Sequence, residues 1–334
     1  MRIVSILGLL ACVVCVGVFP VLLSPNDAVN TIAVFTLIGA IAVVGWNIFS
    51  GSTGYISLGH SVFYGFGAYT LGLVSRGWHI PGGWKLFLLL PLAGLVAGVV
   101  ALPLGWIALR VRRHTFVVIT IAFVFIFQLL AYNLRGITNG SNGVFMPLTP
   151  WVTPFADLPF YYVAFGVLLV AIGVSWWIRH SKYGLGLLAI RDDEGRALGL
   201  GVKTGPYKLV AYVISALFVG MAGGMFVYYV GAIYPEGAFN PAFDITVALM
   251  AFLGGLGTVV VPLVGALFLI PFQQWLDLQF GGKGVNLMIY GLLFLAVILV
   301  LPRDIVPSLQ SWWTSTKPEQ PIKLVERGGR GINQ

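Results

Sequence analysis

Ten apolar segments, separated by polar stretches of different lengths, limit the folds that are open to this chain. About 20 helical residues cross the hydrocarbon core of a bilayer, and most of the apolar runs have about that length. Charged residues make up only 9% of the sequence, against about 25% in a typical soluble domain. The expected segments are 3–23, 29–49, 55–75, 86–109, 115–132, 159–178, 208–231, 244–257, 259–277 and 285–301. The sequence therefore predicts an all-α integral membrane protein with about ten transmembrane or re-entrant helices, two of them interrupted by glycines.

The distribution of basic residues predicts how the chain lies across the membrane. With the N-terminus in the cytoplasm, 15 of the 19 Lys and Arg residues fall on the cytoplasmic side and 4 on the other side. Such an excess is the usual sign of cytoplasmic loops. Both termini are then cytoplasmic, and the short stretch 244–257 has to cross or to turn back with its neighbour. The net charge of +8 follows from this topology, and we expect no nucleic acid partner.

The polar stretches divide the chain into a membrane domain, 1–302, and a partly disordered cytoplasmic tail, 303–334. The central loop 179–208 carries six basic residues and three consecutive acidic residues. Each ionised group costs about 2.5–3.5 kcal/mol at a bilayer centre, so this loop faces water or a partner protein. The loop 133–158, on the side opposite to the cytoplasm, is rich in Gly, Pro and Asn, which favour turns over helix. Cys12 and Cys15 lie together in an apolar segment and are expected to be structural.

Two glycine-rich stretches, 51–60 and 254–258, interrupt long apolar runs at roughly corresponding places in the two halves of the chain. Paired interruptions of this kind indicate a substrate site on broken helices in transporters. Small residues also let helices pack closely, and the sequence does not decide between the two interpretations. For the spaced glycine pairs Gly94/Gly98 and Gly220/Gly224, we expect close packing.

Motifs for catalysis are missing from the sequence. The four histidines do not have the spacing of a metal site, and no phosphate-binding loop of the form G-x-x-x-x-G-K-[ST] occurs. We therefore expect no enzyme activity, no cofactor and no ATP hydrolysis by this chain alone. Asp244 and Asp277 fall at segment ends, where water is close. The scarcity of ionisable residues in the spans argues against a stand-alone secondary carrier. A permease of this kind needs an external source of energy.

Polar and glycine residues on the apolar segments are the candidates for a translocation pathway. For each polar side chain among them, the alternative is an ordinary hydrogen bond between helices. The candidates are Asn47, Ser57, Gly59, His60, Tyr69, Gln128, Gly254, Gly255 and Gly257.

The central loop resembles the cytoplasmic coupling loop of the permease subunits of branched-chain amino acid ABC transporters. Two other stretches, 54–69 and 254–266, fit the same family, as does 138–143 in the outer loop. The matching loop residues are Ser181, Gly184, Leu187, Ala189, Ile190, Arg191, Asp192, Glu194, Ala197, Leu200, Gly201, Tyr207, Lys208 and Leu209. Leu185 and Leu198 depart from the pattern, because the family usually has Arg at the first position and commonly a charged residue at the second.

The resemblance implies a complex in a bacterial inner membrane. Its other members would be a second, homologous permease chain, two cytoplasmic ATPase subunits and a periplasmic substrate-binding protein. The residues expected to couple the chain to the ATPases are Ser181, Gly184, Ala189, Ile190, Arg191, Asp192, Glu194, Ala197 and Gly201. A short helix around 189–198 is expected to seat in a groove on each ATPase. Branched-chain amino acids are the leading substrates, with urea and short amides as the alternative.

Overall fold

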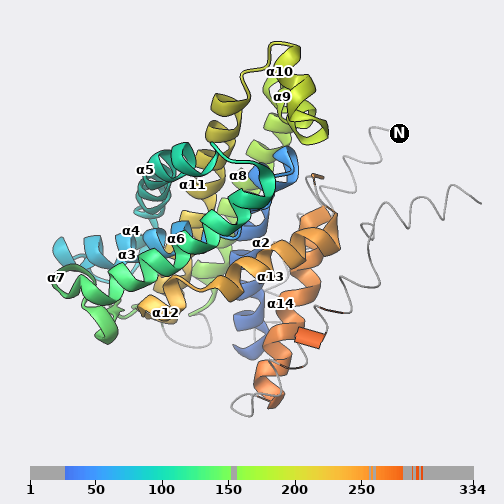
Figure 1. Ribbon diagram of the computed structural model, residues 1–334. Helices are drawn as coiled ribbons and strands as arrows, with labels where there is room; N and C mark the ends of the chain where they lie inside the picture. The colour runs from blue at the N-terminus through green and yellow to red at the C-terminus, as the bar shows by residue number, and fades with distance from the viewer. Residues whose placement is uncertain are drawn as a thin grey trace, which may run out of the picture.

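The structure is a computed structural model that describes most of the chain as a bundle of helices (Figure 1). The expected segments 3–23 and 285–301, the two cysteines and the tail lie wholly or largely outside the described residues. The described residues are 27–151, 156–255, 257–258, 261–280, 288, 291, 292 and 295.

Helices make up nearly all the regular structure of the described residues, as the apolar runs predict. The only strand pair among them is short and antiparallel, with Val144 opposite Ile233. The long helices are α2 (Asp27–Thr53), α3 (His60–Gly77), α5 (Leu90–Ala108), α6 (Arg113–Asn133), α8 (Leu158–His180), α11 (Thr204–Val230), α13 (Pro241–Gly254) and α14 (Val261–Phe280). The short elements are α4 (Trp84–Phe87), α7 (Arg135–Thr138), η1 (Gly140–Asn142), β1 (Val144–Phe145), α9 (Lys182–Asp192), α10 (Glu194–Gly199), β2 (Ala232–Ile233) and α12 (Pro235–Ala238).

Six helical stretches among the described residues are long and apolar enough to cross a membrane. They confirm an all-α membrane protein, whereas the count of about ten helices stays a prediction. One of the six, Pro235–Gly254, has 20 residues and replaces the expected short segment 244–257. Its main helix, α13, begins at Pro241, where the side chain of Asn240 accepts a hydrogen bond from the backbone N–H of Ala242. Gly254 ends it.

The core of the bundle forms where α11 packs against α2, α3 and α5. Small residues allow α5 and α11 to approach closely, because a Cβ added at Gly94 would lie 2.7 Å from the carbonyl oxygen of Leu217. A Cβ added at Gly220 would overlap Ala97. Close packing at these two glycines is therefore confirmed. By contrast, only 22% of the apolar window of α6 is buried, against 78% for α2, so α6 presents a broad face to lipid or to another chain.

The two long polar loops contain more helix than predicted. The prediction of a single helix around 189–198 is wrong. Helix α9 ends at Asp192 and α10 begins at Glu194, with Asp193 extended between them. The loop 133–158 holds α7, η1 and β1 rather than turns alone. Figure 1 shows α9 and α10 together at the top of the view, well away from α7 and α12.

Candidate functional site

The segment between α8 and α11 folds as two short helices, each with a side-chain cap at its start. The hydroxyl of Ser181 accepts a hydrogen bond from the backbone N–H of Gly184 at 3.1 Å. The carboxylate of Asp193 accepts one from the backbone N–H of Arg196 at 3.0 Å. Such caps satisfy N–H groups that have no partner within the helix. The capping bond of Asp193 lowers the pKa of its carboxyl group, as expected for a hydrogen bond to the charged form.

Arg191, in the last turn of α9, reaches the end of α2. Its guanidinium donates a hydrogen bond at 3.0 Å to the carbonyl oxygen of Gly51, which lies in the last turn of α2. The last carbonyl groups of a helix lack partners within it, and this end of the helix dipole favours a positive charge. Arg191 therefore fixes α9 to the C-terminus of α2.

Arg113, the first residue of α6, makes the same kind of contact with α9. Its guanidinium donates to the carbonyl oxygens of Ile190 at 2.8 Å and of Arg191 at 2.7 Å. These are carbonyls in the last turn of α9. Two arginines in series therefore link α6 to α9 and α9 to α2.

Glu194, the first residue of α10, is held by two partners. Its carboxylate accepts a hydrogen bond from the Tyr55 hydroxyl, and it lies 2.6 Å from the ammonium group of Lys208 on α11. Burial alone would raise the pKa of Glu194. The hydrogen bonds from Lys208 and Tyr55 lower it by more than burial raises it, so the net shift is downward. Burial, followed by the contact with Glu194, raises the pKa of Tyr55 above its usual value. We call Arg113, Arg191, Glu194, Tyr55 and Lys208 the anchor cluster.

The two glycine-rich stretches meet beside the anchor cluster. The side chain of Asn47 donates to the carbonyl of Thr258 at 2.7 Å and accepts from the N–H of Gly257 at 3.1 Å. Gly257 has a φ of +77°, which side chains strongly disfavour. A Cβ there would also overlap the guanidinium of Arg191. Gly257 thus makes room for Arg191, while Gly254 and Gly255 terminate α13.

A second group of buried polar residues lies at the start of α3. The ring of His60 is hydrogen-bonded to Ser57 at 2.9 Å and to Ser215 of α11 at 2.7 Å. All three residues are fully buried. The neighbouring Gly59 packs against α6, because a Cβ there would lie 2.6 Å from the carbonyl oxygen of Thr120. Ser57, Gly59 and His60 therefore hold helices together in this conformation.

The expectation that Asp244 lies near water is wrong. Asp244 is fully buried and accepts hydrogen bonds from the backbone N–H and the hydroxyl of Ser61. Ser61 is in the first turn of α3, where unpaired N–H groups and the helix dipole favour a negative charge. The carboxylate thus caps α3 from α13. The side chain of Asp277 is not among those that the structure describes.

The remaining predicted residues are dispersed. Tyr69 lies on α3 beside an apolar cavity, and Gln128 is half-buried on α6. In the central segment, Ile190 and Ala197 are buried, whereas Asp192 is exposed. Gly184 is tightly packed, because a Cβ there would overlap the carbonyl of Ile178. The other two predicted positions, Ala189 and Gly201, lie in α9 and just after α10.

Sequence reasoning missed three members of the anchor cluster as site residues. Arg113 was counted only as one of the charges that set the orientation. In the sequence, Lys208 is a basic residue of the central loop and part of the family pattern, and Tyr55 is part of a glycine-rich stretch that fits the family. A lysine at the start of an apolar segment is the sequence signal for an acidic partner, and in the structure Lys208 is only 3% exposed.

These features define a polytopic membrane protein in which two short helices, α9 and α10, are hydrogen-bonded to the ends of the longer helices α2, α6 and α11. A family model described as the permease component of branched-chain amino acid transport systems matches residues 28–300. The chain belongs to this family, which confirms the resemblance seen in its motifs.

Curated relatives agree with the family match. The chain is 30% identical to the high-affinity branched-chain amino acid transport system permease protein LivM of Salmonella typhimurium, over 85% of this chain and 73% of that protein. It is also 30% identical to LivM of Escherichia coli K12, over 78% and 68% of the two chains. The permease protein LivH of the same strain is 25% identical, over 80% and 90%. No solved structure matches the chain significantly.

Proposed function

We propose that this chain is a permease subunit of an ATP-driven importer of branched-chain amino acids in a bacterial inner membrane. The family match and the names of the LivM and LivH relatives support the substrate class. The single observation that carries the mechanism is the anchor cluster. It connects the segment that resembles a coupling loop to α2, α6 and α11 through hydrogen bonds between charged or polar groups.

We propose that the complex contains two different permease chains. The relatives include both LivM and LivH proteins, and this chain is the more similar to LivM. A homologous second chain would then supply the other half of the pathway. Two ATPase subunits would bind in the cytoplasm, and a binding protein would deliver the amino acid from the periplasm. Both termini of this chain would be cytoplasmic, in accordance with the excess of basic residues on that side.

Exposed leucines on the central segment support docking to an ATPase. Leu185, Leu198 and Leu200 are 65%, 55% and 83% exposed, in a part of the chain that carries too much charge to lie in lipid. Exposed apolar side chains grouped on a short segment are typical of a protein interface. Two of these leucines are the departures from the family pattern. We infer that the ATPase surface opposite them is apolar.

The anchor cluster supplies the connection by which an ATPase would move the spans. A displacement of α9 moves the guanidinium of Arg191, and with it the end of α2 and the Gly257 turn. A displacement of α10 moves Glu194, which acts on Lys208 of α11. Arg113 carries the same motion to α6. Hydrogen bonds to charged groups are stronger than neutral ones, each contributing about 1.5–3 kcal/mol, so the segment moves with these helices rather than past them.

The first experiment is to purify a tagged copy from native membranes in mild detergent and to identify its partners by mass spectrometry. We expect a homologous permease and ATPase chains that carry a phosphate-binding loop. Reconstituted with the binding protein in vesicles, the complex should take up leucine only with ATP. Uptake of urea instead of leucine would favour the alternative substrate. A chain that is isolated alone and transports without ATP would be a secondary carrier, contrary to the proposal.

A further inference from the structure

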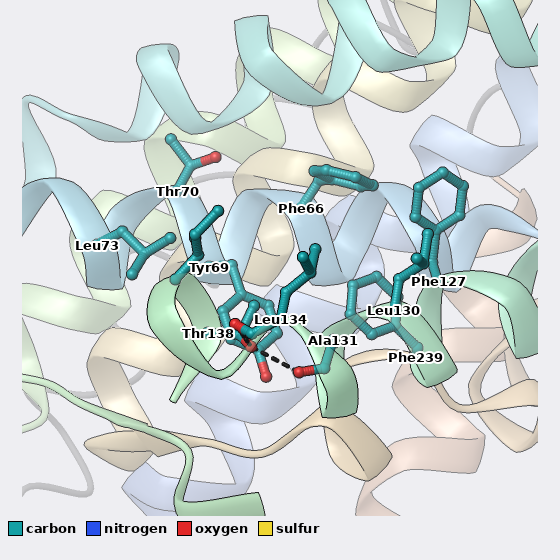
Figure 2. A pocket seen from close by; sticks show the side chains of 11 residues that line it. Phe66, Tyr69, Thr70, Leu73, Phe127, Leu130, Ala131, Leu134, Thr138 and Phe239 are labelled. Atoms are coloured by element: carbon teal, nitrogen blue, oxygen red, sulfur yellow. Dashed lines mark hydrogen bonds between the residues drawn. The ribbon is translucent and has the colours of Figure 1, made fainter. Parts of the chain in front are cut away.

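An apolar cavity of about 270 Å³ lies between α3, the second half of α6 and α7. Figure 2 shows Phe66, Tyr69 and Leu73 of α3 on one side and Phe127 and Leu130 of α6 on another. These lining residues lie toward the ends of α3 and α6 that are remote from α9 and α10. In the proposed orientation, this is the half of the membrane that faces the periplasm.

The hydroxyl of Tyr69 is the feature that makes this cavity a candidate binding site. Tyr69 is only 5% exposed, and its hydroxyl has no hydrogen-bond partner among the residues that the structure describes. A second lining hydroxyl already has a partner, since Thr138 donates to the carbonyl of Ala131 (Figure 2). Buried polar groups in proteins are nearly always paired. A bound molecule with a polar group would provide the missing partner.

The cavity reaches the surface along α6. Three of its lining residues, Leu130, Leu134 and Ile137, are 43%, 47% and 59% exposed. Leu130 belongs to α6, the least buried of the six membrane-capable helices among the described residues, and Leu134 and Ile137 follow directly after it. From this face, which α6 presents to lipid or to another chain, a small molecule reaches the cavity without passing through the packed core around α11.

We propose that this cavity receives the aliphatic side chain of a branched-chain amino acid in transit, and that the Tyr69 hydroxyl binds its amino or carboxylate group. This assignment rests on the proposed function. Ligand sites are mostly apolar with a few polar groups that fix orientation, and the cavity has this composition. A lipid acyl chain would fill the space but would leave the hydroxyl unpaired. An amino acid with an aliphatic side chain satisfies both requirements.

The test uses the assembled transporter in vesicles, with the binding protein saturated by leucine or by valine. Ala131→Leu narrows the cavity, and Ala122→Leu makes the same change at an exposed position of the same helix. We expect Ala131→Leu to lower the ratio of leucine to valine uptake by about tenfold, because a pocket discriminates by size. Ala122→Leu should leave the ratio unchanged. A change in packing alone would slow both amino acids equally.

Tyr69→Phe tests the hydroxyl separately, with Tyr234→Phe as the control because Tyr234 is exposed. We expect Tyr69→Phe to slow leucine and valine uptake alike by about tenfold, the effect of one lost hydrogen bond. Chain insertion and ATP hydrolysis are measured for every variant. Should Ala131→Leu fail to insert, Ala131→Val and Tyr69→Phe decide the question.

Two negative results have different meanings. If wild-type vesicles take up leucine and both cavity variants behave like their controls, the cavity is not on the pathway and the proposed function stands. A lipid chain or the partner permease would then occupy it. If wild-type vesicles take up no branched-chain amino acid, the proposed function is wrong, and the assignment of the cavity falls with it.

Discussion

The two ends of α6 differ in whether the polar groups there have hydrogen-bond partners. At the first residue, Arg113 donates to two carbonyl groups of α9. Near the other end, Leu130 and Ala131 line an apolar cavity in which the hydroxyl of Tyr69 has no partner among the described residues. One end of the helix is tied to a neighbouring segment by charged hydrogen bonds, and the other end borders a cavity of about 270 Å³.

We propose that this difference separates the transmission of motion from the passage of a solute. Displacement is passed on only where groups stay in contact, and charged hydrogen bonds keep α9 in contact with α2 and α6. A solute that has to leave again needs a site that is open and weakly bound. A single helix that carries both arrangements at its ends can respond to an ATPase at one end and change a cavity at the other.

The largest predicted effect comes from removing the anchors. In the double variant Arg191→Ala, Glu194→Ala, α9 and α10 lose their bonds to Gly51, Tyr55 and Lys208. Three hydrogen bonds to charged groups together contribute at least about 4.5 kcal/mol, so we expect ATP-driven uptake to fall by more than about 1000-fold. ATP hydrolysis should continue. The measurement is leucine uptake per ATP hydrolysed in vesicles.

Arg196→Ala is the control for this double variant, because it removes an arginine from the same segment. Its side chain is 86% exposed, and it should leave the ratio of uptake to hydrolysis near that of the wild type. Normal uptake in the double variant, with the chain correctly inserted, would show that the anchor cluster does not couple the two processes.

Gly257→Leu should have the next largest effect. A leucine at a φ of +77° is strained, and its Cβ would displace the guanidinium of Arg191 from Gly51. Strain of about 1–2 kcal/mol together with a weakened anchor predicts a fall in uptake of roughly 30-fold. Gly166→Leu on α8 is the control, because nothing lies within 4 Å of a Cβ there. Equal uptake by the two variants would mean that Gly257 only eases packing.

Most of the helical architecture follows from the length of the apolar runs. A bilayer requires helices of about 20 residues, so runs such as 208–231 and 159–178 fix α11 and α8 within a few residues. The break between α9 and α10 was not predictable in this way. It depends on Asp193, whose side chain caps α10. The sequence shows only that this acid is one of three in a row.

The site was predicted only in part, because local sequence pattern indicates single residues but not their distant partners. Arg191, Glu194, Asn47 and Gly257 were all candidates, and the structure brings them close to one another or to shared partners. Contacts between distant parts of the chain were not predictable from local pattern. Asp244 and Ser61 are 183 positions apart, and nothing around either residue indicates the other. The same holds for Arg113 and its acceptors on α9.

Leu198→Glu should have a smaller effect, which sharpens the distinction between anchoring and docking. Leu198 is 55% exposed on α10. Burying the rest of an aliphatic side chain against an ATPase is worth about 1 kcal/mol, so we expect the affinity for the ATPase to fall by about fivefold. Uptake per ATP hydrolysed should stay unchanged in the complexes that form. Co-purification at several detergent concentrations measures the affinity, and undiminished recovery would exclude Leu198 from the interface.

The smallest effect is a pH dependence that tests the partner of Glu194. The pKa of Glu194 is below its ordinary value of 4.5, so the stability it contributes is present above that value and is lost only as pH falls through the lowered pKa. In Lys208→Gln, burial of the carboxylate is opposed only by neutral hydrogen bonds, and its pKa rises. The variant should therefore melt about 2 °C below the wild type near neutral pH.

This deficit in melting temperature should shrink as pH falls through the raised pKa, because a protonated Glu194 no longer needs the ammonium group. Melting curves in detergent from about pH 8 to about pH 4 measure it, with Lys203→Gln, at an exposed lysine, as the control. A deficit that stays constant over this range would mean that Lys208 stabilises α11 by packing rather than by pairing with Glu194.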